Sequence, residues 1–454
     1  MHIAYTEARR RIAAVAAERR DSFLRDGETV PLHQAVGRTV KTSLFSPAST
    51  PTCDTSAMDG FAVCSALTAS ASPQTPLMLR VVGSIVAGDE ASTFFDTDVV
   101  DGVVPCVEIM TGAPFPLTRS EHCQYDACVP REHTRKSLHD EWLIQIEQPV
   151  EWNQHRRVAG GDYSIGDPIA EEGVVLDPRH IMAAASVGVD SFHCFRRVRV
   201  GVLSTGAELL QESDSRRTND RSKIPDANAP YLLAAMRELG AESHFLGTAP
   251  DGLIETSEHI RSVMTSASFD IIVSSGAVSA GTMDHIPEAL KTLQAAIHFH
   301  HVAIRPGHPA LLATVPLPNQ VDEKVTYFGL PGNPIAAAAC FRFLFMPYYH
   351  GLLGNSQVPC TTATLRRNPQ EPDARIRGLV FSNAKQVDHF RHGRAEMVEG
   401  ELVAQFSAQQ SPAKISPFIA ANCWIHVPPA TGEVLAGDRL HVYFLHDSSI
   451  PVLG

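Results

Sequence analysis

Between about residue 196 and residue 350, short apolar runs of strand type alternate with amphipathic runs of helix type. The strand-like runs are Val198–Leu203, Ile271–Val273 and Val325–Phe328, and the helix-like runs are Tyr231–Leu239, Ile286–Leu293 and Ile335–Phe345. We expect Asn228 to cap the first of these helices and Pro230 to lie in its first turn. Continuous apolar strands that alternate with helices are typical of a sheet covered on both faces. The pattern therefore predicts a parallel, doubly wound α/β domain.

The flanking segments differ, because their short strand-like runs are separated by Ser, Pro, Gly and Asp. Residues 29 to about 157 contain Leu77–Val82 and Trp142–Ile146, and the last hundred residues contain Cys423–Val427 and Leu440–Phe444. Such runs predict small β-rich domains. A chain of 454 residues is also too long for one core. We expect an α/β multidomain protein with a β-rich domain on each side of the α/β domain.

Charge and apolar content argue against two classes of partner. The formal net charge of −12 disfavours nucleic acid, and no apolar run approaches the roughly 20 residues that span a bilayer. The first residues lack the apolar core of a secretory signal. The nine cysteines are irregularly spaced, which favours free thiols in a reducing compartment. We therefore expect a cytoplasmic protein without membrane or nucleic-acid partners.

Small and polar residues follow each predicted strand of the α/β domain. These loops are Ser204–Glu208, Ser275–Gly281 with Asp284, Arg305–Pro309 and Gly329–Pro334. In open α/β sheets, ligands bind outside the carboxyl ends of the strands. Glycine lets backbone N–H groups approach an anion, and a helix N-terminus adds about half a positive charge. None of the loops ends in the Gly-Lys-Ser/Thr of a Walker A motif. The loops predict a site for a phosphate-bearing ligand.

Five carboxylates lie in or beside loop motifs: Asp59, Asp162, Glu208, Asp251 and Asp284. Taken singly, each is more simply a solvated loop acid, because Asp and Glu are mostly exposed. Magnesium, however, is commonly held by one or two carboxylates together with substrate phosphates. The acids and the predicted phosphate loops together favour a metal-assisted reaction at phosphate.

The segment Ser56-Ala57-Met58-Asp59-Gly60-Phe61-Ala62 resembles the signature of the molybdopterin molybdenumtransferase family, which includes the gephyrin E domain. The family usually has Tyr where this chain has Phe61. Further segments are similar to family motifs: Ile109–Pro114, Arg157 with Gly160–Asp162, Ser204–Gly206 with Glu208, Asp226 with Asn228, Ser275 to Asp284, and Leu330–Pro334. The resemblance covers nearly the whole chain.

The resemblance implies a molybdenum insertase that completes molybdenum cofactor synthesis. Such enzymes bind adenylated molybdopterin and molybdate, cleave the adenylyl phosphoanhydride with magnesium, and release AMP. The positions matching the family's active site are Asp59, Thr111, Asp162, Glu208, Asp251 and Asp284, of which Asp59, Glu208, Asp251 and Asp284 are the expected metal ligands. The expected pterin- and phosphate-binding residues are Ser204, Thr205, Gly206, Ser275, Gly276, Ser279, Gly281, Arg305, Pro306, Pro309, Gly332 and Asn333.

The resemblance also implies a division into four domains and a set of partners. Residues 1–48 and 158–195 are expected to form an elongated helical linker domain, 49–157 a β-rich insertion domain, 196–350 the molybdopterin-binding domain, and 351–454 a C-terminal β-barrel-like domain. A homodimer is expected, with Asp59 facing the α/β domain from the partner subunit. Other expected partners are a molybdopterin adenylyltransferase and the molybdoenzymes that accept the cofactor.

Several residues depart from the family pattern. Ala207 replaces Asp or Asn, Ala277 replaces a glycine and would be strained at positive φ, Arg305 and His308 replace lysines, and Glu108 replaces a basic residue. These departures motivate an alternative, a diverged molybdopterin-binding scaffold without turnover. A third candidate is an enzyme that adenylates molybdopterin, against which the Asp59 motif and the C-terminal domain argue.

Two groups of side chains raise the question of a further metal. His122, Cys123, Cys128 and His133 are irregularly spaced for zinc, and Asp126–Val129 instead resembles a family strand. His298 and His300 should share one face of a strand, with His301 on the opposite face. Surface strand residues are the better interpretation of these histidines, because a metal would need further ligands.

Overall fold

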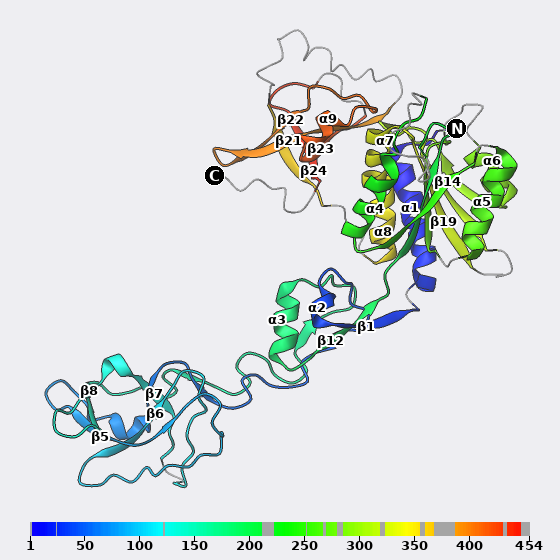
Figure 1. Ribbon diagram of the computed structural model, residues 1–454. Coiled ribbons are helices and arrows are strands. Elements are labelled where there is room, and N and C mark those ends of the chain that lie inside the picture. The colour runs from blue at the N-terminus through cyan, green and yellow to red at the C-terminus, as the bar shows by residue number, and fades with distance from the viewer. Residues whose placement is uncertain are drawn as a thin grey trace. The chain divides into compact units, whose positions relative to one another are not determined.

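The computed structural model describes residues 2–23, 25–120, 123–210, 222–250, 252–266, 269–278, 285–317, 323–354, 359–366, 386–429 and 434–445. Contacts divide the chain into two compact units. The first unit comprises residues 1–28, 37–39 and 195–454, and the second comprises residues 29–36 and 40–194. Each unit is described by itself (Figure 1).

A six-stranded sheet forms the centre of the first unit, in the order β14-β13-β15-β19-β18-β16. Its strands are β13 (Arg199–Thr205), β14 (Glu242–Ala249), β15 (Ile271–Ser275), β16 (Ala296–His300), β18 (Leu311–Pro316) and β19 (Lys324–Leu330). The doubly wound sheet predicted from the sequence is confirmed. It differs in one strand, since β18 runs antiparallel to both of its neighbours. The connection from Pro316 to Lys324 is too short for the crossover that a parallel strand would need.

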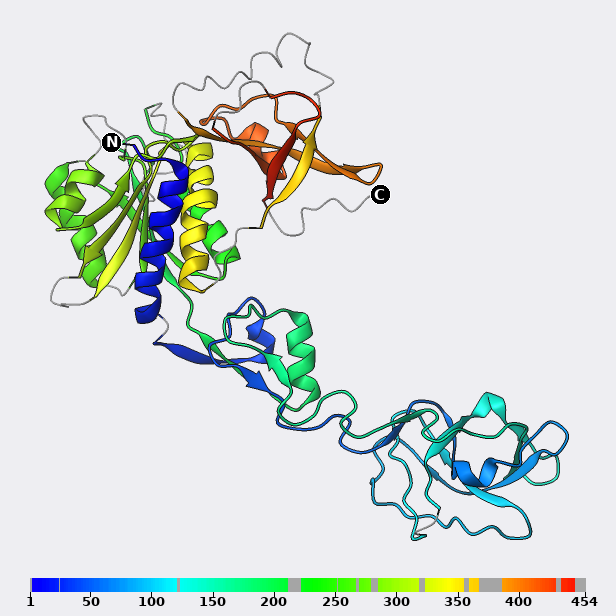
Figure 2. The same cartoon turned by 180° about the vertical axis from the view of Figure 1, so that it is seen from behind.

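Helices cover both faces of this sheet (Figures 1 and 2). One face carries α1 (Tyr5–Phe23), α4 (Asn228–Glu238) and α7 (Pro334–Cys340), the last continued by a π-helical turn, Phe341–Phe345, and by α8 (Met346–Leu352). The other face carries α5 (Leu253–Ser266) and α6 (Ile286–Thr292). Val202 packs into the first layer and Leu203 into the second. Alternate strand residues thus feed two cores, which explains the continuous apolar runs.

The first turn of α4 is capped by a residue that lies before the expected one. The helix begins at Asn228, but the Asp226 carboxylate accepts hydrogen bonds from the backbone N–H groups of Asn228 at 2.9 Å and Ala229 at 3.1 Å. The Asn228 side chain caps nothing, because it turns toward the end of the sheet instead. Asp226 thereby fixes both the start of α4 and the loop that precedes it.

The C-terminal part of the first unit is a closed β structure. Its sheet has the order β17-β21-β22-β20-β24-β23, and an additional pairing joins β21 to β23. The strands are β17 (Ile304–Arg305), β20 (Thr361–Leu365), β21 (Asp388–Val398), β22 (Glu401–Phe406), β23 (Cys423–Val427) and β24 (Arg439–Phe444), with the short helix α9 (Ser416–Ile419). The predicted C-terminal β domain is confirmed. Through β17 it is hydrogen-bonded to a loop of the α/β layer.

The second unit is rich in β structure, as the sequence predicts. Its main sheet has the order β7-β4-β6-β5-β9-β8. These strands are β4 (Gly60–Val63), β5 (Leu77–Ile85), β6 (Val104–Ile109), β7 (Ala127–Pro130), β8 (Arg135–Lys136) and β9 (Leu143–Ile146), and the unit also holds α2 (Leu32–Ala35) and α3 (Pro178–Ser186). Three two-stranded sheets pair β1 (Gly27–Pro31) with β12 (Ser191–Phe195), β2 (Leu44–Phe45) with β11 (Pro168–Ala170), and β3 (Thr55–Ser56) with β10 (Arg156–Arg157).

The expectation that every cysteine is a free thiol is wrong at one pair. Cys64, which follows β4, forms a disulfide with Cys123, which precedes β7. Because β4 and β7 are neighbouring strands, the sheet brings together two thiols that lie 59 residues apart in the sequence. The bond also removes Cys123 from the group of residues considered for zinc.

Two further results bear on the sequence interpretation. None of the described helices is both long and apolar enough to cross a bilayer. Helix α1 packs against α8 in the first unit, whereas the sequence interpretation places residues 1–48 in a linker domain. The four domain boundaries remain predictions.

Candidate functional site

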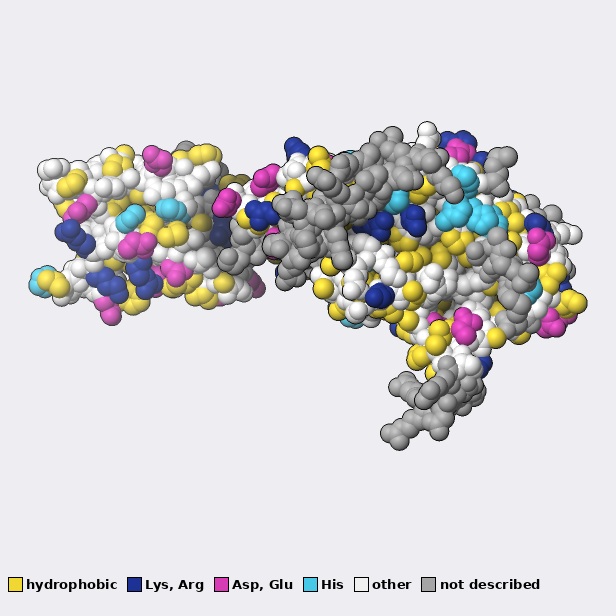
Figure 3. Space-filling model, turned by 90° about the horizontal axis from the view of Figure 1, so that it is seen from above, with side chains coloured by type: hydrophobic (Ala, Val, Ile, Leu, Met, Phe, Trp, Pro, Cys, Tyr) yellow, Lys and Arg dark blue, Asp and Glu magenta, His cyan; other side chains and the backbone are white. Residues whose placement is uncertain are grey.

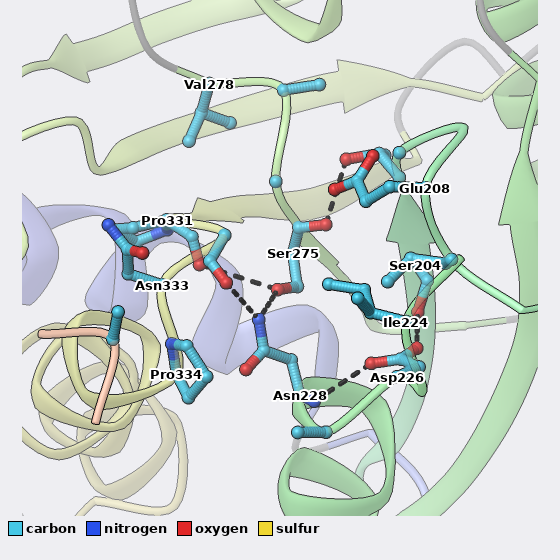
Figure 4. Close-up of a pocket in the computed structure, with 18 of the residues that line it drawn as sticks. Ser204, Glu208, Ile224, Asp226, Asn228, Ser275, Val278, Pro331, Asn333 and Pro334 are labelled. Atoms are coloured by element: carbon cyan, nitrogen blue, oxygen red, sulfur yellow. Dashed lines mark hydrogen bonds between the residues drawn. The ribbon is translucent and has the colours of Figure 1, made fainter. Parts of the chain in front are cut away.

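A cavity of about 790 Å³ opens at the carboxyl ends of the central strands of the first unit. Its wall is formed by the loops after β13, β15 and β19, by Pro309, and by Ala413 and Ile415 of the C-terminal part (Figure 4). This is the edge at which open α/β sheets bind ligands, and the volume is in the range of small-molecule sites. Eight of the twelve predicted pterin- and phosphate-binding residues line it: Ser204, Thr205, Gly206, Ser275, Gly276, Pro309, Gly332 and Asn333.

A chain of hydrogen bonds forms the floor of the cavity (Figure 4). The Ser204 hydroxyl donates to the Asp226 carboxylate. The Asn228 side-chain amide donates to the Ser275 hydroxyl at 2.6 Å and to the Gly332 carbonyl at 2.8 Å. Asn228 is 9% exposed, so the network lies at the bottom of the cavity. It connects three strand-end loops and holds them in one arrangement.

Two of the glycines in these loops have positive φ, and at Gly276 an added Cβ would also meet the backbone of Thr205. A Cβ atom at Gly276, where φ is +95°, would lie 2.5 Å from the Thr205 Oγ1 atom and 2.8 Å from the Thr205 carbonyl oxygen. At Gly206, with φ at +134°, it would lie 2.6 Å from both carboxylate oxygens of Glu208. The Gly276 N–H already donates to the Leu330 carbonyl at 2.9 Å. Gly276 therefore serves close packing of the loops rather than donating to an anion.

Glu208 supplies an exposed carboxylate at the cavity wall. Within the described part of the chain its side chain takes part in no hydrogen bond, in contrast to the Asp226 carboxylate in the floor. The Lys223 ammonium donates to the neighbouring Ala207 carbonyl, which brings a positive charge beside this loop. Glu208 is therefore the described acid of the cavity that is uncommitted and available to a ligand or a metal ion.

The structure shows that Ala277 does have the positive φ at which it is expected from the sequence to be strained. Its φ is +52°, in the left-handed region where an L-residue is disfavoured. The Ala277 carbonyl accepts a hydrogen bond from the backbone N–H of Ile286 at 3.3 Å, at the start of α6. The methyl group therefore lies in the cavity wall at a position that glycine would occupy without strain.

The loop after β16 carries a cationic side chain, Arg305, which pairs in register with His389 of β21. Burial, and then the charge of Arg305, lower the pKa of the Arg391 guanidinium from its usual value. Pro306 follows Arg305 in this loop, although it does not line the cavity.

The predicted residues of the second unit form a separate group. Asp59 is exposed, and its Oδ1 atom accepts hydrogen bonds from the Thr111 N–H at 2.7 Å and the Thr111 hydroxyl at 2.8 Å. These bonds, first that of the N–H and then that of the hydroxyl, hold the pKa of the Asp59 carboxyl below its usual value. Thr111 therefore acts as an orienting group for Asp59.

The negative charge that Glu108 adds to this region is compensated. Arg131 forms an ion pair with Glu108 at 2.6 Å, and its charge also contributes to the lowered pKa of the Asp59 carboxyl. The acidic residue at position 108, where the family has a basic one, is thus paired with the cation of Arg131. Asp162 is exposed in a loop and bonds through its backbone N–H to the Thr50 carbonyl at 2.9 Å.

Four predicted site residues, Ser279, Gly281, Asp251 and Asp284, lie outside the described residues. Within the described residues, no group of three or more His, Cys, Asp or Glu side chains is placed to hold a metal ion. The structure also adds residues that the predicted list omits. Asp226 and Asn228 could have been found from the sequence, because they stand at the start of a predicted helix near the strand ends. Nothing in the sequence near Ala413 and Ile415 indicates a ligand.

The interpretation of the histidines requires one correction. His301 does not lie opposite His300, because the two rings are stacked with their centroids 3.9 Å apart. β16 ends at His300, and a left-handed backbone at His301, with φ at +74°, breaks the alternation of side chains that an extended strand would impose.

Comparison with protein families matches three regions of the chain. Residues 3–188 match the MoeA N-terminal region (domain I and II), residues 201–351 a probable molybdopterin binding domain, and residues 379–445 the MoeA C-terminal region (domain IV). The chain is 32% identical over 320 residues to a molybdopterin molybdenumtransferase from Synechococcus elongatus, covering 70% of this chain and 74% of that protein. A molybdopterin molybdenumtransferase from Haemophilus influenzae is 28% identical over 421 residues, covering 91% of this chain and 93% of that protein.

Solved structures agree on the fold. The molybdopterin biosynthesis MoeA protein from Pyrococcus horikoshii OT3 superposes with a TM-score of 0.72 at 19% identity, covering 98% of this chain and all of that chain. A second structure of the Pyrococcus protein gives a TM-score of 0.70 at 24% identity, covering 94% and 98% of the two chains. At these identities the superposition establishes the architecture alone.

Proposed function

The chain belongs to the MoeA family of molybdopterin molybdenumtransferases, which are transferases of molybdenum cofactor biosynthesis, and from this premise we propose a specific reaction. The protein inserts molybdate into adenylated molybdopterin, depends on magnesium, and releases AMP. The observation that carries the proposal is the cavity of about 790 Å³ lined by the strand-end loops that match family motifs.

The first unit is proposed to hold the adenylated pterin. The side chain of Asn333 lines the cavity, as do Ser204, Thr205 and Ser275, whose hydroxyl groups already donate within the protein. Arg305, in the same loop as the cavity-lining Pro309, is a cation that suits an anionic substrate. The adenylated pterin and the molybdate would then be bound by loops that the floor network holds in place.

The described acids fit a magnesium ion that arrives with substrate. Glu208 is uncommitted at the cavity wall, and magnesium often needs only one or two carboxylates when substrate phosphates complete its shell. Asp251 and Asp284 remain the other proposed ligands from this unit. When bound, the metal would neutralise charge at the phosphoanhydride. The floor residues Asp226 and Asn228 would orient the loops that present Glu208.

Asp59, with Thr111 and Asp162, is proposed to complete the site from a second subunit of a homodimer. The Asp59 carboxylate is exposed and held in one orientation by Thr111, so a surface from another chain can meet it. It would contribute a charged oxygen beside the metal or the phosphate. We also propose that the protein acts in the cytoplasm, receives its substrate from a molybdopterin adenylyltransferase, and passes the cofactor to molybdoenzymes.

The test supplies purified protein with adenylated molybdopterin, magnesium and molybdate and measures AMP by chromatography. We expect AMP release that requires both magnesium and molybdate. If molybdopterin binds and no AMP appears, the insertase proposal is wrong and the scaffold alternative is favoured. Release of AMP without any dependence on magnesium would remove the metal from the proposal.

A further inference from the structure

Four histidines gather beside the cavity of the first unit, on a face where Figure 3 shows histidine side chains crowded together. The rings of His300 and His301 are stacked at 3.9 Å, and those of His301 and His308 are stacked at 5.1 Å. His2 lies edge-on to His308 at 5.8 Å. We call His300, His301 and His308 the imidazole stack.

One end of the stack is bonded to the cavity wall. The Nε2 atom of His300 lies 2.7 Å from the carbonyl oxygen of Val278. A carbonyl can only accept, so this nitrogen carries the proton and donates. Val278 lines the cavity directly after the strained Ala277. His300 therefore holds the segment whose methyl and backbone form one side of the site.

The other end of the stack lies on the loop that carries Pro309. The Nδ1 atom of His308 donates to the Val302 carbonyl at 2.8 Å, which fixes the ring against its own loop. Pro309, the next residue, lines the cavity. Stacking of His301 between the two other rings thus connects two separate walls of the cavity. The left-handed backbone at His301 is what brings its ring into this position.

The stack is sensitive to charge. The groups that act most strongly on His301, besides burial itself, are His300, His308, the chain's amino terminus and His2, and all of them are bases. Burial, and then these neighbours, lower the pKa of the His301 imidazole to about 4. The His301 imidazole is therefore uncharged at neutral pH, so it can stack between the other two rings without carrying a charge of its own.

We propose that His300 is a positioning residue, which holds the Ala277–Val278 wall of the cavity through the Val278 carbonyl and is itself held by the imidazole stack. The consequence for ligand affinity rests on the proposed function, because it takes the cavity to be the pterin site.

The first test needs no ligand. Hydrogen exchange of the peptide covering Ser275–Val278 is compared at neutral pH in the wild type, His300→Ala, His300→Gln and His298→Gln. The control residue His298 lies on the same strand and bonds to the Thr314 side chain at 3.1 Å rather than to the cavity. We expect faster exchange in His300→Ala alone, because glutamine can still donate to the carbonyl. Equal exchange in all four proteins overturns the positioning role.

The second test measures molybdopterin affinity under anaerobic conditions at pH 7.5. At pH 7.5, His300→Ala should weaken binding about threefold to tenfold, which is the usual effect of losing one hydrogen bond, while His300→Gln binds as the wild type does. Equal affinity in the wild type and His300→Ala contradicts the positioning role.

The two tests separate this inference from the proposed function. If the wild type binds no molybdopterin, the proposed function fails, and the exchange experiment still decides whether His300 holds the wall. If the wild type binds and releases AMP while His300→Ala exchanges and binds normally, the proposed function stands and the inference about His300 is wrong.

Discussion

The two groups of predicted site residues are built in opposite ways. In the second unit, Asp59 is exposed and receives two hydrogen bonds from Thr111, so that one acid is oriented on an open surface. In the first unit, the Asp226 carboxylate is hydrogen-bonded within the floor network. Glu208 is the acid at the cavity wall whose side chain takes part in no hydrogen bond among the described residues. The hydrogen bonds of the floor network hold the shape of a cavity, whereas the hydrogen bonds from Thr111 hold a single carboxylate on an open surface. The contrast predicts that substitution of Asp59 affects chemistry and that substitutions in the loops that form the floor of the cavity affect binding and stability.

The largest effect is expected from Asp59→Ala. The carboxylate is exposed, so the fold should be unchanged, and loss of a charge that contacts the reacting phosphate or its metal commonly lowers rates by about 100-fold or more. AMP release should fall by that factor while molybdopterin affinity is retained. Glu141→Ala, which removes another exposed acid of the same unit, is the control and should be fully active. Loss of pterin affinity in Asp59→Ala would contradict the division of roles.

A substitution in the loops that form the floor of the cavity should instead reduce stability and molybdopterin binding. Gly276→Ala introduces both positive-φ strain and a contact of 2.5 Å with Thr205, which together should destabilise the first unit by about 3 kcal/mol. Pterin binding should be lost with it. Gly400→Ala is the matched control, because its φ is also positive, at +83°, but a Cβ there meets nothing within 4 Å. It should destabilise by about 1 kcal/mol. Thermal unfolding of both variants checks the difference, and equal values would be inconsistent with packing of the loops.

A smaller effect of opposite sign is expected from Ala277→Gly. Glycine removes the strain at φ +52° but adds entropy to the unfolded chain, so a net gain of about 0.5–1 kcal/mol is expected. The wall also becomes wider by one methyl group. A rise in the melting temperature checks the sign. A fall in stability would show that the methyl group packs favourably in the wall.

The smallest effect is a shift in titration. Thr111→Val removes the hydroxyl bond to Asp59 and keeps the N–H bond, so the lowered pKa of the Asp59 carboxyl should move part of the way back toward its usual value. Because the pKa of the Asp59 carboxyl is lowered in the folded protein, its contribution to folding stability is present above the unfolded pKa and is lost as the pH falls through the folded pKa. The acid limb of AMP release should therefore move to higher pH. Carbon NMR of the Asp59 carboxyl checks the direction, and an unchanged limb would mean that another acid controls it.

Much of the fold could be predicted because its signals are local. The strands around Val200, Ile272 and Tyr327 are short continuous apolar runs, and the helices between them repeat their apolar residues at helical spacing. The strand β18 is not among the predicted strands, and its antiparallel direction follows from its pairing with β16 and β19 rather than from its sequence. The cap of α4 was assigned to Asn228 rather than Asp226, because both residue types are good caps and only the tertiary contact of Asn228 with Ser275 decides between them.

By itself, the sequence determined the alternating cores, the family, and the residue types that could bind phosphate and metal, since each depends on local pattern or on motifs. It also identified Ala277 as a departure that would be strained at positive φ, and the structure supplied that angle. Only the tertiary structure decided the pairing of Cys64 with Cys123, the compensation of Glu108 by Arg131, and the stacking of His301 on His300. The reason is that these contacts join residues whose proximity depends on strand order or on one backbone angle, and neither quantity is encoded in the spacing of residues along the chain.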